Sequence, residues 1–238
     1  MAPHSYPLFE RENHLFVELP EGPFLIDTGS PMSFGTVGRI TLAGETYTLH
    51  QRAGAAGMSF SMSDISKLVT GPCIGLLGMD VLGKHSIRYS YRAGNLHVGD
   101  SADVERGTVV ASGNLMGVPM VGIHSRGANV CALFDTGAQY GYVLKRSLLD
   151  GLTSTGYISD YNPMLGDISG DSYSLPYQLI DENGEIIGPL MHETVGFLDA
   201  GMLGGLLGML GAEAIIGWHL LENVDLLMRQ DGGIELIP

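Results

Sequence analysis

Phe24-Leu25-Ile26-Asp27-Thr28-Gly29-Ser30 is echoed 108 residues later by Ala132-Leu133-Phe134-Asp135-Thr136-Gly137-Ala138. In each copy an apolar run typical of a buried strand leads into Asp-Thr-Gly, where glycine permits a tight turn. One such tripeptide arises by chance in roughly one chain in twenty of this length, whereas two with matching apolar neighbours are very rare. The repeat therefore predicts an internal duplication.

A second motif follows each copy of the first. Gly75-Leu76-Leu77-Gly78 corresponds to Ala214-Ile215-Ile216-Gly217, and each leads into a tail of β-like sequence with a central turn, Ile87–Val98 and Leu226–Leu236. This repetition predicts one fold used twice, as an N-terminal lobe over residues 1–105 and a C-terminal lobe over residues 106–238.

Local patterns predict the elements around these motifs. A hairpin is expected before each Asp-Thr-Gly, at His14–Leu19 with Gly22–Ile26 and at Pro119–His124 with Asn129–Phe134. Further hairpins are expected at Gly38–Leu49 and at Pro176–Ile180 with Ile186–Leu190. Helical spacing predicts a helix over Tyr142–Leu152 and short helices over Asp64–Val69 and Met202–Leu210.

Composition limits the classes of function. The chain has 238 residues, 35 of them glycine, and a formal net charge of −14, which argues against a nucleic acid or an anionic membrane as partner. Met1–Pro20 lacks the pattern of a signal peptide, and Ala200–Ala212 is too short to span a bilayer. Cys73 and Cys131 are expected to be free thiols in a reducing compartment, which predicts a cytoplasmic protein. The histidines lack metal-ligand spacing, so no metal site is predicted.

Because each half contains one such aspartate, we expect the two aspartates to face each other across a pseudo-two-fold axis. Asp27 and Asp135, held that close, cannot both ionise easily and would share a proton. The ionised carboxylate could then act as base toward a water molecule while the protonated carboxyl polarises a carbonyl group.

These motifs resemble the aspartic proteases of the retropepsin/pepsin superfamily, and the resemblance covers both halves. It implies an all-β, bilobal acid-protease fold, with two pseudo-symmetric small β-barrel lobes and a few short helices. It also implies that Asp27 and Asp135 hold the attacking water, that Thr28 and Thr136 interlock, and that Gly29 and Gly137 let the substrate backbone approach. The implied enzyme needs no cofactor, acts on a peptide or protein substrate and works as a monomer.

The chain departs from the family at several points. It is shorter than a pepsin, close to two fused retropepsin subunits, and it has no disulfide framework. Ser30 follows the first Asp-Thr-Gly, whereas Ala138 follows the second. A hydroxyl group at Ser30 could donate to Asp27 and lower its proton affinity, which predicts that Asp135 holds the shared proton.

The spacing suggests where a flap that closes over a substrate lies. Asp27 precedes Gly78 by 51 residues, whereas Asp135 precedes Gly217 by 82 residues. The extra length predicts a single flap within Gly156–Leu175, with its tip near Leu165–Gly170 and its substrate contacts at Tyr161, Leu165, Gly166 and Tyr173. Gly54–Gly57 is the competing candidate, and a surface loop without a catalytic role is the third possibility.

The sequence thus predicts an aspartic endopeptidase in which a water activated by two aspartates hydrolyses peptide bonds. Three alternatives remain open. The chain could be a catalytically silent peptide-binding module that retains the cleft, a structural protein in which the repeat serves folding alone, or a precursor-derived form whose own N-terminus blocks the cleft.

Overall fold

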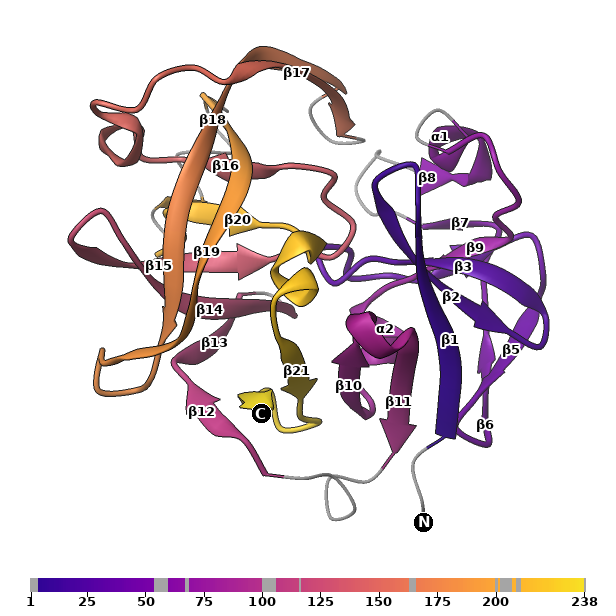
Figure 1. Ribbon diagram of the computed structural model, residues 1–238. Helices are drawn as coiled ribbons and strands as arrows, with labels where there is room; N and C mark the ends of the chain where they lie inside the picture. The colour runs from indigo at the N-terminus through magenta and orange to yellow at the C-terminus, as the bar shows by residue number, and fades with distance from the viewer. Residues whose placement is uncertain are drawn as a thin grey trace.

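The computed structural model describes residues 4–53, 60–66, 69–99, 106–115, 117–162, 166–199, 201, 207–208 and 211–237. Over these residues the chain is mostly β, as predicted, with short helices only. Figure 1 shows most strands of the first half on the right and most strands of the second half on the left, with β10 and β21 between them.

The larger sheet of the described residues has ten strands. Their order is β12 (Thr108–Val110), β22 (Ile234–Ile237), β21 (Asp225–Met228), β10 (Ser86–Ser90), β11 (Asn95–Gly99), β1 (His4–Arg11), β2 (His14–Leu19), β3 (Gly22–Ile26), β9 (Gly75–Leu77) and β4 (Phe34–Gly35).

A second sheet of the described residues has eight strands, all from the second half. Their order is β13 (Ser112–Leu115), β14 (Val118–Ser125), β15 (Ala128–Phe134), β20 (Ala214–Ile216), β16 (Gly141–Val143), β19 (Ile186–Phe197), β18 (Gly166–Ile180) and β17 (Gly156–Asn162). Two small hairpins complete the strands, β5 (Arg39–Leu42) with β6 (Glu45–Thr48) and β7 (Arg52–Ala53) with β8 (Phe60–Ser61).

The helices described are one turn or little more. They are α1 (Met62–Ile65), α2 (Met79–Leu82) and the 3₁₀ turns η1 (Tyr91–Ala93), η3 (Arg146–Leu149) and η4 (Trp218–Glu222). At α1 the N-cap N–H of Ser61 donates to Asp64 Oδ2 (3.0 Å), so the helix begins before the predicted Asp64. Most of the helix predicted over Met202–Leu210 lies outside the described residues.

The helix predicted over Tyr142–Leu152 is wrong. The segment begins as β16, which runs parallel to β19 and antiparallel to β20, and only Arg146–Leu149 form a 3₁₀ turn. All three residues of β16 are buried. Pairing on both sides of this strand outweighs the weak helical spacing of its apolar residues. The predicted hairpins are confirmed, because β2–β3, β14–β15, β5–β6 and β18–β19 pair in antiparallel register.

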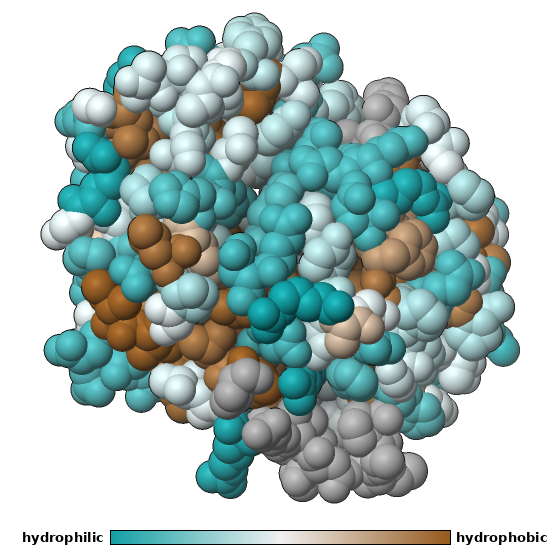
Figure 2. All heavy atoms as spheres, in the orientation of Figure 1, coloured by the Kyte–Doolittle hydropathy of each residue, from teal (hydrophilic) through white to brown (hydrophobic). Residues whose placement is uncertain are grey.

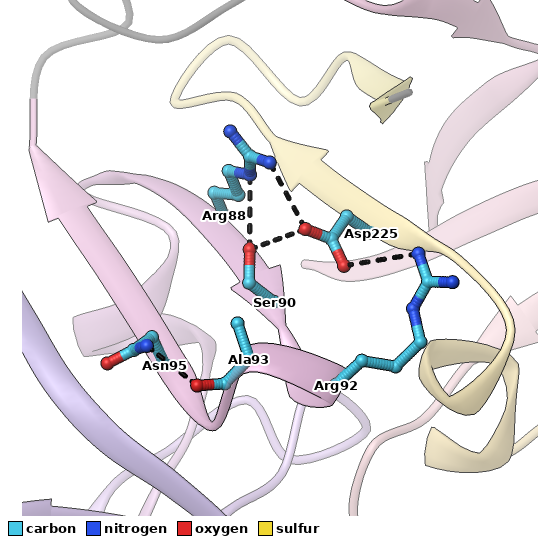
Figure 3. A network of polar contacts seen from close by, with 6 residues as sticks. All are labelled: Arg88, Ser90, Arg92, Ala93, Asn95 and Asp225. Atoms are coloured by element: carbon cyan, nitrogen blue, oxygen red, sulfur yellow. Dashed lines mark hydrogen bonds and ion pairs between the residues drawn. The ribbon is translucent and has the colours of Figure 1, made fainter.

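Strands of the two halves meet within the larger sheet. β10 pairs with β21 in antiparallel register from Ile87↔Met228 to Tyr89↔Leu226. Beside this pair the Asp225 carboxylate accepts a hydrogen bond from Ser90 Oγ (2.6 Å) and lies 3.1 Å from the Arg88 guanidinium (Figure 3). The two halves are therefore joined by a continuous sheet.

The main apolar core also crosses between the halves, since one cluster includes buried Ile26, Leu77, Phe134 and Ile216. On the surface, brown apolar atoms gather in Figure 2 where Figure 1 shows β12 and the lower end of the β18–β19 hairpin, and Val109, Ile186 and Leu190 are exposed there. Among the described residues, no helix has the length and apolar character needed to cross a membrane.

Candidate active site

The two aspartates follow equivalent strands. Asp27 comes after β3, which runs parallel to β9, and the Asp27 N–H donates to Leu77 O (3.0 Å). Asp135 comes after β15, which runs parallel to β20, and the Asp135 N–H donates to Ile216 O (2.9 Å). The two apolar-apolar-Gly motifs therefore lie directly beside the strands that present the aspartates.

Two buried threonines link the Asp-Thr-Gly turns. Thr28 Oγ1 donates to Phe134 O (2.6 Å) and accepts the Thr136 N–H (2.9 Å). In the mirrored arrangement, Thr136 Oγ1 donates to Ile26 O (3.0 Å) and accepts the Thr28 N–H (3.0 Å). Both threonines are fully buried. These four hydrogen bonds fix the position of one turn relative to the other.

The glycine of each Asp-Thr-Gly turn lies against the carboxyl group of the opposite half. A Cβ atom on Gly137 would fall 2.5 Å from Asp27 Cγ, and a Cβ atom on Gly29 would overlap the carboxylate of Asp135. Only glycine lets the carboxyl groups lie this close to the opposite turn. The structure therefore brings Asp27, Thr28, Gly29, Asp135, Thr136 and Gly137 together.

We expect Gly137→Ala to destabilise the protein by about 1–3 kcal/mol, because the added methyl group displaces the Asp27 carboxyl group from its position. Gly38→Ala is the matched control, since nothing lies within 4 Å of a Cβ atom there. Denaturant unfolding of both variants tests this. Equal stability of the two variants would contradict the placement.

The environment of the two carboxyl groups raises the proton affinity of both. Burial, followed by the negative charge of Asp135, raises the pKa of Asp27 well above its ordinary value, and the N–H groups of Ser30 and Gly29 offset part of this rise. Burial also raises the pKa of Asp135, and the Gly137 N–H, the hydrogen bond with Asp27 and the N–H groups of Gly29 and Ala138 offset part of that rise. The two side chains hydrogen-bond each other. The two carboxyl groups therefore share a proton and titrate as one coupled pair.

The structure removes the hydrogen bond on which the prediction that Asp135 holds the shared proton depends. The Ser30 hydroxyl group donates to Met32 O (2.9 Å), and it is the backbone N–H of Ser30 that donates to Asp27 Oδ1 (2.8 Å). In the second half the Gly137 N–H donates to Asp135 Oδ1 (3.0 Å). The difference between Ser30 and Ala138 thus gives neither carboxyl group a hydroxyl donor, and it does not decide which of them holds the shared proton.

A pocket opens over the two carboxyl groups. Its apolar walls come from both halves, with Leu25, Phe34, Ile65 and Leu76 on one side and Tyr142, Leu198 and Ile215 on the other. Ser30 and Ala138 also line it. Figure 1 shows α1 and β17, which supply Ile65 and Tyr161, near the top of the molecule. The pocket can hold an apolar group on either side of the aspartates.

The segment predicted as the flap is a hairpin that reaches this pocket. β17 pairs with β18 from Gly156↔Ser172 to Asn162↔Gly166, so Gly166 belongs to the last pair of strand residues that the structure describes there. Tyr161 and Asp160 line the pocket. Asp160 Oδ2 accepts the Tyr142 O–H (2.6 Å) and so ties the hairpin to the pocket wall.

Other parts of the flap prediction need correction or fall outside the described residues. The predicted tip extended to Gly170, but Gly170 pairs with Ile158 well along the hairpin. Tyr173 packs against the main core and lines a separate hollow with Arg146 and Phe197. Leu165 and the competing segment Gly54–Gly57 lie outside the described residues.

Two pocket residues were missed by sequence reasoning. His14 is buried, lines the pocket, and places Nδ1 2.8 Å from Glu12 O, while burial lowers its pKa. It begins a buried strand, which is the signal that could have singled it out. Asp160 lies on a strand of mixed polarity and carries no such signal. Among the described residues, no group of three or more His, Cys, Asp or Glu side chains could hold a metal ion.

Comparison with known proteins adds a likeness in fold. No protein-family model matches the chain, and no curated protein matches it. A solved structure that resembles it is conglutin gamma, described as a unique basic 7S globulin from lupine seeds, with a TM-score of 0.51 and 11% sequence identity. The alignment covers 98% of this chain and 95% of that one. At this identity the likeness concerns the fold alone.

Proposed function

We propose that the chain is an aspartic endopeptidase with a bilobal acid-protease fold, in which Asp27 and Asp135 activate a water molecule between the two halves. The observation that carries the proposal is the linked pair of Asp-Thr-Gly turns, which places two half-buried carboxyl groups in one pocket. A purely structural repeat gives no reason to bury two carboxyl groups against each other, because their mutual repulsion costs stability.

We propose that Asp27 holds the shared proton when the water molecule attacks, which sets the order of proton transfers. A water molecule between the carboxyl groups gives a proton to ionised Asp135 and attacks the peptide carbon. Protonated Asp27 donates its proton to the carbonyl oxygen, which gives a neutral tetrahedral intermediate. Transfer of the proton from Asp135 to the nitrogen, with return of the hydroxyl proton to Asp27, breaks the C–N bond and restores both carboxyl groups. No cofactor takes part.

The pocket favours an extended peptide with apolar side chains on both sides of the cleaved bond, since apolar walls from each half flank the aspartates. Both aspartates come from one chain, so a monomer suffices. Cys73 and Cys131 are both free thiols, which fits a reducing compartment such as the cytoplasm.

Incubation with a diverse peptide library between about pH 3 and pH 8, with products identified by mass spectrometry, tests the proposal. Cleavage that pepstatin inhibits is the expected result. Peptides that bind without being cut at any pH would favour the silent binding module instead. Products cut from the chain's own N-terminus would indicate the precursor form.

The β17–β18 hairpin should contribute to substrate binding through Tyr161 and not through Tyr173. We expect Tyr161→Ala to lower kcat/KM by about tenfold, because it removes a wall of the pocket. Tyr173→Ala should instead lower the melting temperature, since Tyr173 packs against the core. Tyr157→Ala is the control, because Tyr157 on the same strand is 69% exposed. A Tyr161 variant with unchanged kcat/KM would contradict a flap at β17–β18.

A further inference from the structure

The loop after Asp27 is held in place by a serine. Ser33 Oγ accepts the Gly78 N–H (2.8 Å), and the Ser33 hydroxyl group in turn donates to Asp80 Oδ1 (2.6 Å). Gly78 packs directly under this loop, since a Cβ atom there would lie 2.7 Å from Ser30 O. A side-chain acceptor therefore anchors the apolar-apolar-Gly motif beneath the first aspartate.

The equivalent serine is missing from the second half. Gly141 lies six residues after Asp135, just as Ser33 lies six residues after Asp27. Gly217 nevertheless packs under the second loop as Gly78 does under the first, since a Cβ atom on Gly217 would lie 2.9 Å from Ala138 O. The Gly217 N–H thus needs an acceptor from elsewhere in the chain.

Glu193 of β19 supplies that acceptor. Glu193 Oε1 accepts the Gly217 N–H (2.7 Å), and Oε2 lies 3.4 Å from the Tyr177 hydroxyl oxygen, which donates to it. A Cβ atom on Gly141 would lie 3.0 Å from Glu193 Oε1, so the carboxyl group occupies the space that a serine at residue 141 would fill. Glu193 is only 2% exposed.

We propose that Glu193 is a positioning residue for Asp135: its carboxyl group replaces the missing serine, anchors Gly217 and so holds the second catalytic loop. The positioning role rests on the proposed peptidase function, whereas the anchoring itself does not. The sequence offers a signal for Glu193, because it lies between Met191 and Val195 in the period-two pattern of buried strand residues.

The anchor acts as a neutral acid. Burial, with a smaller contribution from the charge of Glu222, raises the pKa of Glu193 to about 8, while the Gly217 N–H and the Tyr177 O–H lower it. Tyr177 on β18 and Glu222 on η4 act on it, and His219 Nδ1 on η4 lies 3.6 Å from the Cβ position of the anchored Gly217. The unfolded carboxyl group ionises near 4.5, so folding retains a proton between pH 4.5 and about 8. Stability from this group therefore falls as the pH rises through that window.

Three variants separate anchoring from mere burial. Glu193→Gln keeps an acceptor that cannot ionise, and Glu193→Ala removes the acceptor. Glu193→Ala combined with Gly141→Ser transplants the arrangement of the first half, for which the Val195 methyl group, 2.9 Å from the new Cβ atom, must shift. Gly141→Ser alone is the matched control, because it crowds the Glu193 carboxyl group that still occupies the space.

Amide hydrogen exchange measures how firmly Gly217 is held, and it does not depend on enzymatic activity. We expect Glu193→Ala to lower protection of the Gly217 and Ala138 N–H groups by at least ~10-fold, and the double variant to restore most of it. The Gly78 N–H of the first half should stay unchanged. With Glu193→Gln, protection should persist and the fall in stability between pH 4.5 and 8 should become shallower.

Turnover supplies the second readout. The Glu193→Ala variant should lose kcat by about tenfold with little change in KM, and the added serine should restore it. If the serine restores neither protection nor kcat, or if Glu193→Gln follows the wild-type pH dependence of stability, the inference is wrong. If hydrogen exchange follows the expected pattern but neither the wild type nor any variant cleaves peptides, the anchoring role of Glu193 is supported and the proposed peptidase function is wrong.

Discussion

Replacing Asp27 with Asn is expected to abolish peptide cleavage and at the same time to stabilise the fold. The amide cannot donate the proton that Asp27 passes to the carbonyl oxygen, so turnover should fall by at least ~10³-fold. Asp135→Asn should be as damaging, because it removes the base that takes the proton from water.

The gain in stability has a defined dependence on pH. The folded pKa of Asp27 lies well above the value of 3.8 of an unfolded carboxyl group, so the contribution of this group to wild-type stability falls as the pH rises above 3.8. The Asn variant escapes this loss, and its advantage should therefore be larger at pH 7 than at pH 4. Urea unfolding at both pH values, beside peptide assays, measures the two effects together.

Asp171→Asn is the control, because the Asp171 side chain is exposed on β18. This substitution should leave turnover and stability unchanged. An Asp27→Asn variant that still cleaves peptides would refute the dyad. A variant that loses activity but gains no stability would show that Asp27 is not protonated in the folded protein.

Thr28→Val is expected to destabilise the protein by roughly 3 kcal/mol, because it leaves two buried backbone groups without partners. In the wild type the Thr28 hydroxyl group donates a hydrogen bond to Phe134 O and accepts one from the Thr136 N–H. Valine has nearly the same shape, so the loss comes from the hydrogen bonds and not from a cavity. Denaturant unfolding measures it.

The same substitution at an exposed site gives the control for valine itself. Thr41 lies on β5 with its side chain exposed, and Thr41→Val should change stability by no more than about 0.5 kcal/mol. If Thr28→Val is equally mild, the four hydrogen bonds between the turns do not hold the two halves in register. Activity should fall together with stability, because the threonine link sets the distance between the aspartates.

The elements that the sequence predicts well are those with a strong local pattern. The strands of the hairpins before Asp27 and Asp135 have apolar or alternating apolar and polar residues and are bounded by clear turn residues. A β-hairpin is one of few structures that bury the apolar residues of such segments. The repeat of Asp-Thr-Gly over 108 residues adds a long-range constraint, so residues far apart could be placed in one site. The local pattern and the repeat together were sufficient to pair the two aspartates, whereas the link between the threonines was predicted from the family resemblance.

Other features depend on contacts that no local pattern records. Residues 142–143 became strand because β19 and β20 both pair with them, and the Ser30 hydroxyl group turned to Met32 O instead of Asp27. Glu193 occupies the place of a serine that the second half lacks, and only the packing of β19 under Gly217 reveals this. Contacts of this kind, between residues far apart in the chain, cannot be predicted from local patterns in a single sequence.

The sheet shared by the two halves has a consequence during synthesis on the ribosome. β10 has β11 beside it early, but its other neighbour, β21, is made only when residues 225–228 have been translated. Until then the nascent chain displays an open strand edge, which is a site for mispairing and for chaperones. The ladder that joins the two halves can therefore form only after nearly the whole chain has been made.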